Sequence, residues 1–276
     1  MTSTPAGAVV TGAGRGLGKQ IAALLVERGY RVLVTDVDAT AAQVTADELG
    51  GGTTSLAVDV REYAQVEAAR DAIIERAGRL DLWVNNAGVL ITGPVWEQDE
   101  PTRRLMIEVN ALGTINGTVA ALEGMRDGGG HVVNIVSLAG LTAVPGEAVY
   151  AASKHAAIGF SLSTIADLRL AGITNIDISC ICPDGIWTPM LYDKLDDPAS
   201  ALSFSGKLLG PDEVVGAVRK VLDRPRLVTT IPRWRGLMVR VGDMLPRFGL
   251  KAVPLMVAQG RRVQTKLKST VGPRTS

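Results

Sequence analysis

The sequence is poor in cysteine and histidine, with two of each among its 276 residues. Cys180 and Cys182 stand two apart in an apolar run, so they point to the same side of a predicted strand and are not expected to bridge each other. A disulfide framework is therefore excluded, and nothing indicates an oxidising compartment. His131 and His155 have no ligand-like partners nearby in the sequence, so we expect no metal site.

Long apolar runs are also missing. No stretch reaches the ~20 apolar residues that a membrane-spanning helix needs, and the N-terminus lacks the charged and apolar regions of a signal peptide. We therefore expect a cytoplasmic protein. Glycine, in contrast, is abundant at 31 residues, which suits tight turns and close approach of the backbone to a ligand.

The first apolar run is followed by a glycine-rich turn and a helical pattern. The run covers residues 8–11, the turn 12–18, and Ile21, Leu24 and Leu25 are spaced for a helix. Such a turn lets the backbone approach a pyrophosphate at a helix N-terminus. Gly12, Gly16 and Gly18 give a G-x-x-x-G-x-G spacing, because Leu17 stands where the last glycine of the G-x-G-x-x-G pattern is expected. A merely flexible turn is the alternative.

Asp36 ends the next predicted strand, residues 31–35, and stands 24 residues after Gly12. A carboxylate there can accept hydrogen bonds from the adenosine ribose hydroxyls of NAD and would repel a 2′-phosphate. We therefore expect NAD rather than NADP, although Arg15 could meet such a phosphate. Alternatively, Asp36 could be the N-cap residue of the following helix, although Asp38 could cap that helix equally well.

Strand-like and helix-like segments then alternate along the chain, and residues 101–126 are predicted to form one long helix that contains Asn110. This alternation predicts an α/β fold with a doubly wound parallel sheet. Several polar or glycine-containing motifs follow the carboxyl ends of predicted strands, which is the edge where ligands bind in such sheets. These motifs begin at Gly12, Asp59, Asn86, Ser137 and Pro183.

Tyr150 and Lys154 lie four apart on a predicted helix over residues 150–171, one turn from each other. The pKa of a free tyrosine is near 10, and a neighbouring ammonium lowers it toward the value that a base requires. The pair is thus a candidate acid/base device, although the same spacing occurs on many solvated helices.

Together these motifs resemble those of the short-chain dehydrogenase/reductase family, of its short single-domain branch, in the correct order over residues 8–188. The resemblance implies that Tyr150 is the base and that Lys154 lowers the pKa of the phenol and holds the nicotinamide ribose. It implies that Ser137 donates to the substrate oxygen and that Asn110 orders a proton relay. It also implies that NAD is bound by Gly12, Arg15, Gly16, Leu17, Gly18, Asp36, Asp59, Val60, Asn86, Ala87, Gly88, Tyr150, Lys154, Pro183, Ile186 and Thr188.

One position departs from the family pattern. Asp184 follows Pro183, where the family usually has glycine. Aspartate tolerates left-handed backbone better than most residues, and a carboxylate at this place could instead tune substrate choice. The resemblance further implies a lid over the substrate at residues 189–210. Its apolar residues favour an apolar substrate such as a sterol, a terpenoid or a lipid-like ketone; the alternative is that they serve only to dock the lid.

The C-terminal part differs in charge from the rest. Residues 1–223 carry 17 basic and 27 acidic side chains, a net charge of −10, whereas residues 224–276 carry 12 basic side chains and one acidic residue, Asp243, a net of +11. We predict a catalytic domain over residues 1–232 and a basic amphipathic helical extension over 233–276.

Prolines divide this extension. Pro246 should break its first helix and Pro254 should end a second, with the last residues, from about 266, disordered. The extension packs on the body or on another subunit, lies on a membrane surface, or recognises an anionic substrate.

We expect an NAD-dependent enzyme that transfers hydride between nicotinamide and a secondary alcohol or ketone. A non-catalytic dinucleotide-binding redox sensor or scaffold is the alternative, but it has no need for Ser137, Tyr150 and Lys154. We expect no nucleic acid partner. The resemblance implies a homotetramer or dimer, with helix packing aided by the small residues Ala151, Ala152, Ala156, Ala157 and Gly159.

Overall fold

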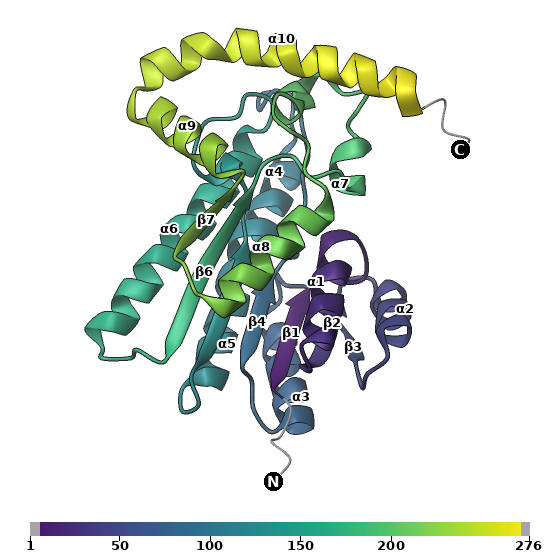
Figure 1. The fold of residues 1–276 in the computed structure, drawn as a ribbon, viewed down its shortest axis with the longest axis vertical. Coiled ribbons are helices and arrows are strands. Elements are labelled where there is room, and N and C mark those ends of the chain that lie inside the picture. The colour runs from purple at the N-terminus through teal and green to yellow at the C-terminus, as the bar shows by residue number, and fades with distance from the viewer. Residues whose placement is uncertain (1–5, 272–276) are drawn as a thin grey trace.

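The computed structural model describes residues 6–271 and contains a seven-stranded parallel sheet. The strand order is β3-β2-β1-β4-β5-β6-β7 (Figure 1), which confirms the predicted doubly wound fold. The strands are β1 Gly7–Thr11, β2 Arg31–Asp36, β3 Thr54–Ala57, β4 Leu82–Asn85, β5 Gly130–Ile135, β6 Ile176–Pro183 and β7 Val228–Ile231.

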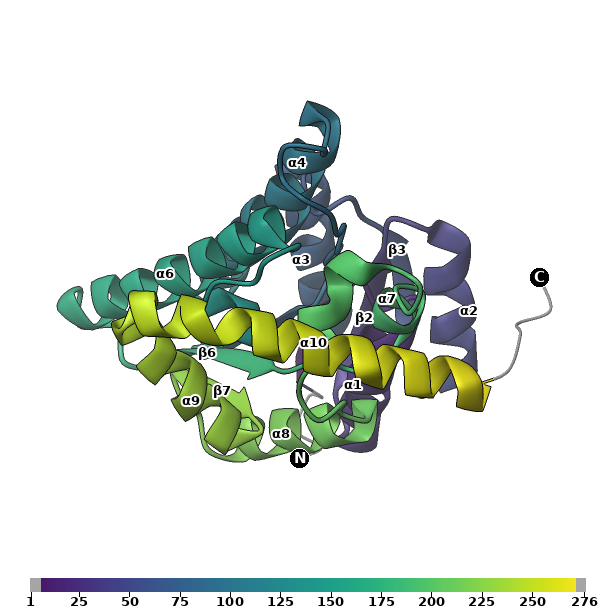
Figure 2. The ribbon, with the colours of Figure 1, turned by 90° about the horizontal axis from the view of Figure 1, so that it is seen from above.

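Helices cover both faces of the sheet and its carboxyl edge (Figures 1 and 2). They are α1 Gly16–Glu27, α2 Ala39–Leu49, α3 Tyr63–Ala77, α4 Glu100–Ile107, α5 Gly113–Met125, α6 Ala148–Leu170, α7 Pro189–Tyr192, α8 Pro211–Asp223, α9 Arg233–Met244 and α10 Pro246–Val271.

Strand β1 shows why the central strands are unbroken apolar runs. Ala8 and Val10 pack on the side of α1 and α8, whereas Val9 packs on the opposite side with α3 and α5. All three residues are fully buried. Because helices cover both faces, successive residues of a central strand must all be apolar. The order of the strands reverses between β1 and β4, and this point at the carboxyl edge is where a doubly wound sheet binds ligands.

The predicted long helix over residues 101–126 is present but is not uniform. A π-helical turn, Glu108–Leu112, joins α4 to α5 and contains Asn110. The stretch Glu100–Met125 is also long and apolar enough to be a candidate membrane span, contrary to our expectation. More than half of its apolar 18-residue window, 56%, is buried inside the protein, and core helices commonly have this composition.

Two predictions about the C-terminal helices are wrong. Pro246 separates α9 from α10 as predicted, but Pro254 lies inside α10 and does not end it. The N–H that proline lacks would bond the carbonyl of Leu250, and this part of α10 is exposed, so solvent can reach that carbonyl. Residues 266–271 are helical rather than disordered, because Leu267 packs against the lid. Residues 272–276 lie outside the described part of the chain.

The lid segment 189–210 lies beneath α10, which crosses the carboxyl edge of the sheet (Figure 2). It contains α7 and a 3-10 helix, Pro198–Phe204. The buried Gln264 of α10 donates to the carbonyl of Asp197 and to Ser200 Oγ, both at 3.0 Å. A Cβ atom on Gly260 would lie only 1.7 Å from the Ala201 carbonyl oxygen, so glycine permits this close packing. The extension therefore packs on the body, as one of the three interpretations proposed.

Two smaller predictions are clarified by the fold. Cys180 and Cys182 are both free and buried in one cluster, which confirms that they do not bridge. Of the five small residues of α6 named for helix packing, Ala151 and Ala157 are buried within the chain, whereas Ala152, Ala156 and Gly159 are exposed. The homo-oligomer and the domain boundary at residue 232 stay predictions.

Candidate active site

The glycine-rich turn after β1 depends on three glycines for different reasons. Gly12 and Gly16 both have φ of 60°, in the left-handed region that other residues rarely adopt. Position 18 requires glycine for steric reasons, since a Cβ atom on Gly18 would lie 2.3 Å from the Gly12 carbonyl oxygen. Leu17 directs its side chain into the core and leaves its backbone at the start of α1. Arg15 is the exposed N-cap residue of that helix.

Asn86 holds this turn in place. Its side-chain nitrogen donates to the carbonyls of Thr11 at 3.0 Å and Gly12 at 2.9 Å. The backbone N–H groups of Asn86 and Ala87 both donate to the Thr11 hydroxyl, at 3.0 and 3.1 Å. Asn86 therefore has a structural function at this turn. Gly88 lies against two of the site residues, because a Cβ atom there would lie 3.2 Å from Asn110 Oδ1 and 3.6 Å from Lys154 Nζ.

Asp36 and Asp38 have separate functions at the end of β2. Asp36 accepts hydrogen bonds from the N–H groups of Gly14 at 3.0 Å and Asp38 at 3.1 Å, which fixes its carboxylate beside the glycine turn. Asp38 caps α2 by accepting from the Ala41 N–H at 3.1 Å. The helix cap is thus Asp38, and Asp36 lies where a ribose acceptor is needed.

The aspartate after β3 is paired with a residue that the sequence analysis did not select. Arg61 Nε lies 2.9 Å from Asp59 Oδ1, and hydrogen bonds from Arg61 hold the pKa of Asp59 below its ordinary value. Val60 is buried beside this pair. Arg61 also faces Glu108 at 3.6 Å. This arrangement keeps Asp59 ionised and oriented.

Asn110 lies behind the site and connects two of its elements. Its Oδ1 accepts from the Val89 N–H at 2.8 Å, and its Nδ2 donates to the Val89 carbonyl at 2.9 Å and to Ser153 Oγ at 3.1 Å. The π-helical turn directs this buried side chain toward the loop after β4. Asn110 therefore fixes the position of α6 relative to that loop.

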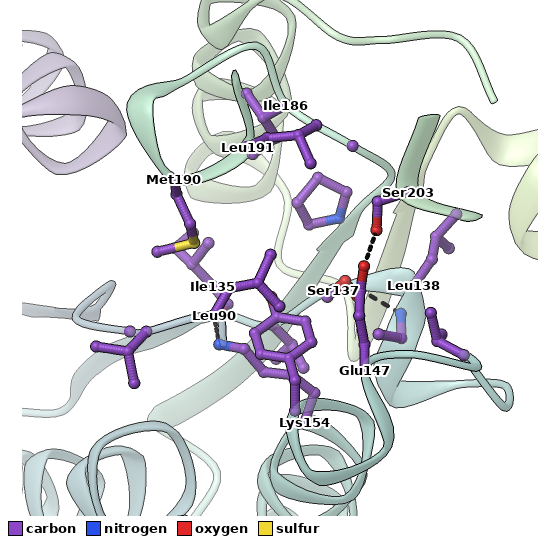
Figure 3. Close-up of a pocket in the computed structure, with 18 of the residues that line it drawn as sticks. Leu90, Ile135, Ser137, Leu138, Glu147, Lys154, Ile186, Met190, Leu191 and Ser203 are labelled. Atoms are coloured by element: carbon purple, nitrogen blue, oxygen red, sulfur yellow. Dashed lines mark hydrogen bonds between the residues drawn. The ribbon is translucent and has the colours of Figure 1, made fainter. Parts of the chain in front are cut away.

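Ser137, Tyr150 and Lys154 come together at the carboxyl ends of β5 and β6. Ser137 is the N-cap residue of a 3-10 helix, Leu138–Gly140, and its Oγ accepts from the Ala139 N–H at 3.1 Å. Burial raises the pKa of Tyr150 above its ordinary value, and a hydrogen bond with Ser137 opposes this shift. Figure 3 shows Lys154 on one side of the cavity, opposite Met190.

Lys154 is buried and close to the tyrosine. Its Nζ donates to the Ile135 carbonyl at 3.3 Å and lies 5.6 Å from the centre of the Tyr150 ring. Burial lowers the pKa of Lys154 to about 8. Within the protein alone, burial raises the pKa of Tyr150, and the group that lowers it is Ser137 rather than Lys154.

Asp184, the departure from the family pattern, is used to hold the C-terminal extension. Its Oδ2 lies 3.1 Å from Nε of Arg235 on α9, and both side chains are almost completely buried. In the described residues no non-glycine residue has a positive φ, so Asp184 does not occupy left-handed backbone. Gly206 of the lid packs on the carboxylate, where a Cβ atom would lie 2.2 Å from Oδ2. Thr188 caps the following α7 through its backbone.

All predicted site residues except Asn110 line one cavity of about 930 Å³. Its dinucleotide side begins at Gly12 and Asp36, and its other side reaches Ser137, Tyr150 and Lys154. The predicted Pro183, Ile186 and Thr188 lie in the same wall. The remaining walls are mainly apolar and include Leu90, Val144, Met190, Leu191, Met238 and Met256.

Glu147 also lines this cavity and was missed by the sequence analysis. It is the N-cap residue of α6 and stands three residues before Tyr150, and an acidic residue so close in sequence to the candidate base was the available signal. The side chain is buried and accepts a hydrogen bond from Ser203 of the lid (Figure 3). Burial raises the pKa of Glu147 to about 7. The catalytic helix and the lid therefore meet through a carboxyl group that titrates near neutral pH.

We expect Glu147 to make the protein less stable as pH rises. The folded protein binds this proton more tightly than the unfolded chain, so the free energy of unfolding falls as pH rises from about 4.5 to about 7. Urea unfolding at pH 5 and pH 8 should show Glu147→Gln losing less stability than the wild type, by on the order of 2 kcal/mol. The exposed Glu97→Gln serves as the control and should behave like the wild type. Equal losses for all three proteins would show that Glu147 is ionised when folded.

A sheet of this order, with a dinucleotide turn and a Ser–Tyr–Lys group at one cavity, is the architecture of nicotinamide-dependent oxidoreductases. The profile described as short chain dehydrogenase matches residues 6–199. The chain belongs to the short-chain dehydrogenase family.

Individual relatives agree with this assignment. The putative oxidoreductase SadH of Mycobacterium tuberculosis is 36% identical over 268 residues, which cover 92% of this chain and 94% of that protein. A Burkholderia phymatum short-chain dehydrogenase/reductase solved with NAD has a TM-score of 0.78 at 29% identity, covering 87% of this chain and 94% of its own. An alcohol dehydrogenase from Thermococcus sibiricus, complexed with 5-hydroxy-NADP, has a TM-score of 0.71 at 26% identity, covering 82% and 95%. A nicotinamide dinucleotide is thus the cofactor class.

Proposed function

We propose that this enzyme transfers a hydride between NAD and a secondary alcohol or ketone with an apolar body. The observation that carries the proposal is the single cavity, which joins the predicted dinucleotide turn to Ser137, Tyr150 and Lys154 and continues between apolar walls. Bound NAD supplies the hydride acceptor, and the positive charge of its nicotinamide favours the phenolate of Tyr150.

Each catalytic side chain has a distinct task in this mechanism. During alcohol oxidation Tyr150 takes the hydroxyl proton, and during ketone reduction it returns a proton to the carbonyl oxygen. Ser137 donates a hydrogen bond to the same substrate oxygen and stabilises the charge that develops there. Lys154 holds the nicotinamide ribose with its remaining N–H groups. Asn110 acts through the other groups by positioning Ser153 of α6 and the loop at Val89.

The choice of NAD follows from Asp36. Its carboxylate lines the cavity beside the glycine turn and is oriented by two backbone N–H groups. A fixed negative charge there accepts ribose hydroxyl hydrogen bonds and repels a 2′-phosphate. Arg15 also lines the cavity and is the group that would favour NADP.

Replacing Asp36 with Asn should shift cofactor preference toward NADP. The amide keeps an oxygen for the Gly14 N–H but loses the charge, so the ratio of kcat/KM for NAD over NADP should fall about 10- to 100-fold. Steady-state kinetics with both cofactors measure this ratio. Asp38→Asn is the matched control and should leave it unchanged, since Asp38 caps α2. A wild type that prefers NADP, and loses that preference in Arg15→Ala, would contradict the assignment.

The apolar walls determine the proposed substrate class. Val144, Met190, Leu191 and Met256 line the cavity together with Tyr150, and the polar part of a substrate placed against them would lose hydration. A sterol, terpenoid or lipid-like alcohol would instead bury its body favourably.

The test is formation of NADH from a panel of secondary alcohols of increasing apolar size. We expect kcat/KM to rise with apolar area until the cavity is filled. A protein that binds NADH tightly but oxidises no alcohol in the panel and reduces no matching ketone would instead be a redox sensor or scaffold.

A further inference from the structure

Helix α9 presents an apolar face to solvent. Its outward residues repeat at helical spacing, so they form one continuous stripe, and each is at least 40% exposed. They are Trp234, Leu237, Met238, Val241, Met244 and Leu245. Leu250, near the start of α10, is also exposed, at 56%. We call these seven residues the α9–α10 apolar face.

The opposite side of α9 is anchored, so this orientation is fixed. Val239 is buried, and Arg235 pairs with Asp184 at 3.1 Å and donates to Ser205 Oγ at 2.8 Å. A Cβ atom on Gly236 would lie 2.1 Å from the Thr230 hydroxyl, so glycine brings α9 directly onto β7. The helix cannot rotate to bury its outward residues without breaking these contacts.

Basic residues border the α9–α10 apolar face. Arg233 and Arg240 stand seven apart, beside the apolar stripe on α9, and both are exposed. Arg247 is exposed near the start of α10. Asp243, the one acidic residue of this basic extension, lies on the side of α9 away from the stripe. An exposed apolar stripe with flanking arginines is the pattern of a helix that lies in a membrane interface.

The cavity of the active site reaches this surface. Met238 and Leu250 belong to the α9–α10 apolar face and also line the cavity. Gly242, Asp243, Pro246 and Gly249, which lie between them in sequence, also line the cavity. α9 and α10 lie together at the end of the molecule that carries the carboxyl edge of the sheet (Figure 1). An apolar molecule at this surface is therefore already beside the cavity.

We propose that the α9–α10 apolar face binds the surface of an anionic lipid bilayer and that the substrate enters the cavity from the lipid. The inference rests on the proposed function only in taking the substrate to be apolar. A second copy of the chain fits this face less well than a bilayer does. A symmetric dimer would bring the arginines of two equivalent faces together, and these like charges repel. An anionic bilayer pairs with these arginines and buries the apolar stripe at the same time.

Co-sedimentation with vesicles tests this proposal. The wild type should bind vesicles of phosphatidylcholine and phosphatidylglycerol, bind pure phosphatidylcholine more weakly, and dissociate as salt is raised. Replacing both Arg233 and Arg240 with Gln should weaken binding roughly 30-fold, since each basic residue near the surface contributes about one kilocalorie per mole. The double variant Leu237→Glu/Met244→Glu should abolish it.

The matched control is Leu170→Glu. Leu170 is 87% exposed at the end of α6, far from α9, and its substitution should leave vesicle binding intact. None of the substituted residues lines the cavity, so oxidation of a short water-soluble alcohol should be the same in every variant. Loss of vesicle binding is thereby separated from failure of the proposed catalysis.

Three results would overturn the lipid proposal. The first is a wild type that does not bind anionic vesicles. The second is a Leu237→Glu/Met244→Glu variant that binds them as the wild type does. The third is sedimentation equilibrium showing a wild-type dimer that this double variant dissociates, which would assign the α9–α10 apolar face to a second copy of the chain.

Discussion

Replacing Tyr150 with Phe should reduce kcat for alcohol oxidation by about 10²–10⁴-fold, the range for loss of a general acid/base group. The substitution removes only the hydroxyl group, and the ring remains packed with Ala139 and Ala151. Binding of NADH, measured by titration of its fluorescence, should therefore be unchanged.

Ser137→Ala is the companion variant for this prediction. It should also lower kcat, because it removes the donor to the substrate oxygen, but it leaves the tyrosine in place. Because the hydrogen bond with Ser137 opposes the rise in the pKa of Tyr150, its loss should also move the limb along which alcohol oxidation rises with pH to higher pH. A Tyr150→Phe enzyme with wild-type turnover would remove Tyr150 from the mechanism.

Replacing Lys154 should damage both turnover and cofactor binding, which distinguishes it from Tyr150. The buried ammonium uses one N–H for the Ile135 carbonyl and is directed into the cavity near Gly88. Lys154→Ala should lower kcat/KM by at least the factor expected for Tyr150→Phe and should weaken NADH binding about 10- to 100-fold, as expected for loss of charged hydrogen bonds.

Lys154→Met separates charge from volume in this experiment. Methionine fills much of the same space without a charge, so it should bind NADH as poorly as Lys154→Ala does. If Lys154→Met binds NADH as tightly as the wild type, the lysine does not hold the ribose and its effect on turnover has another origin.

The parts of the site that could be predicted from the sequence are those that depend on residues close together along the chain or on the ends of successive strands. Gly12 and Gly16 both have φ of 60°, a backbone conformation that favours glycine. The positions of the glycines in the sequence therefore indicate the turn directly. Tyr150 and Lys154 are brought together by one helical turn, and every predicted strand end lies at the same edge because the sheet is parallel. These relations are visible in the order of residues along the chain.

The missed features depend on partners that are distant in sequence. Glu147 is significant because Ser203 of the lid contacts it, 56 residues further along the chain. Asp184 is explained by Arg235 on α9, and helix α10 continues past Pro254 because Gln264 binds the lid. The spacing patterns that predicted the strands and helices contain no information about which distant elements meet.

The contact between α10 and the lid also changes how the lid is understood. We predicted a segment over residues 189–210 that covers the substrate, and the structure adds a second layer above it, in which Gln264 and Gly260 contact the lid directly. Together with the Asp184–Arg235 pair, this layer connects the substrate end of the cavity to the surface formed by α9 and α10.

The most direct test of the proposed hydride transfer uses a secondary alcohol deuterated at the carbinol carbon. The enzyme is incubated with this alcohol and NAD, and the reduced cofactor is analysed by mass spectrometry. We predict reduced cofactor that carries the deuterium, formed by the wild type and nearly absent with Tyr150→Phe. Reduced cofactor without deuterium, or equal yields from both proteins, would contradict direct transfer at this site.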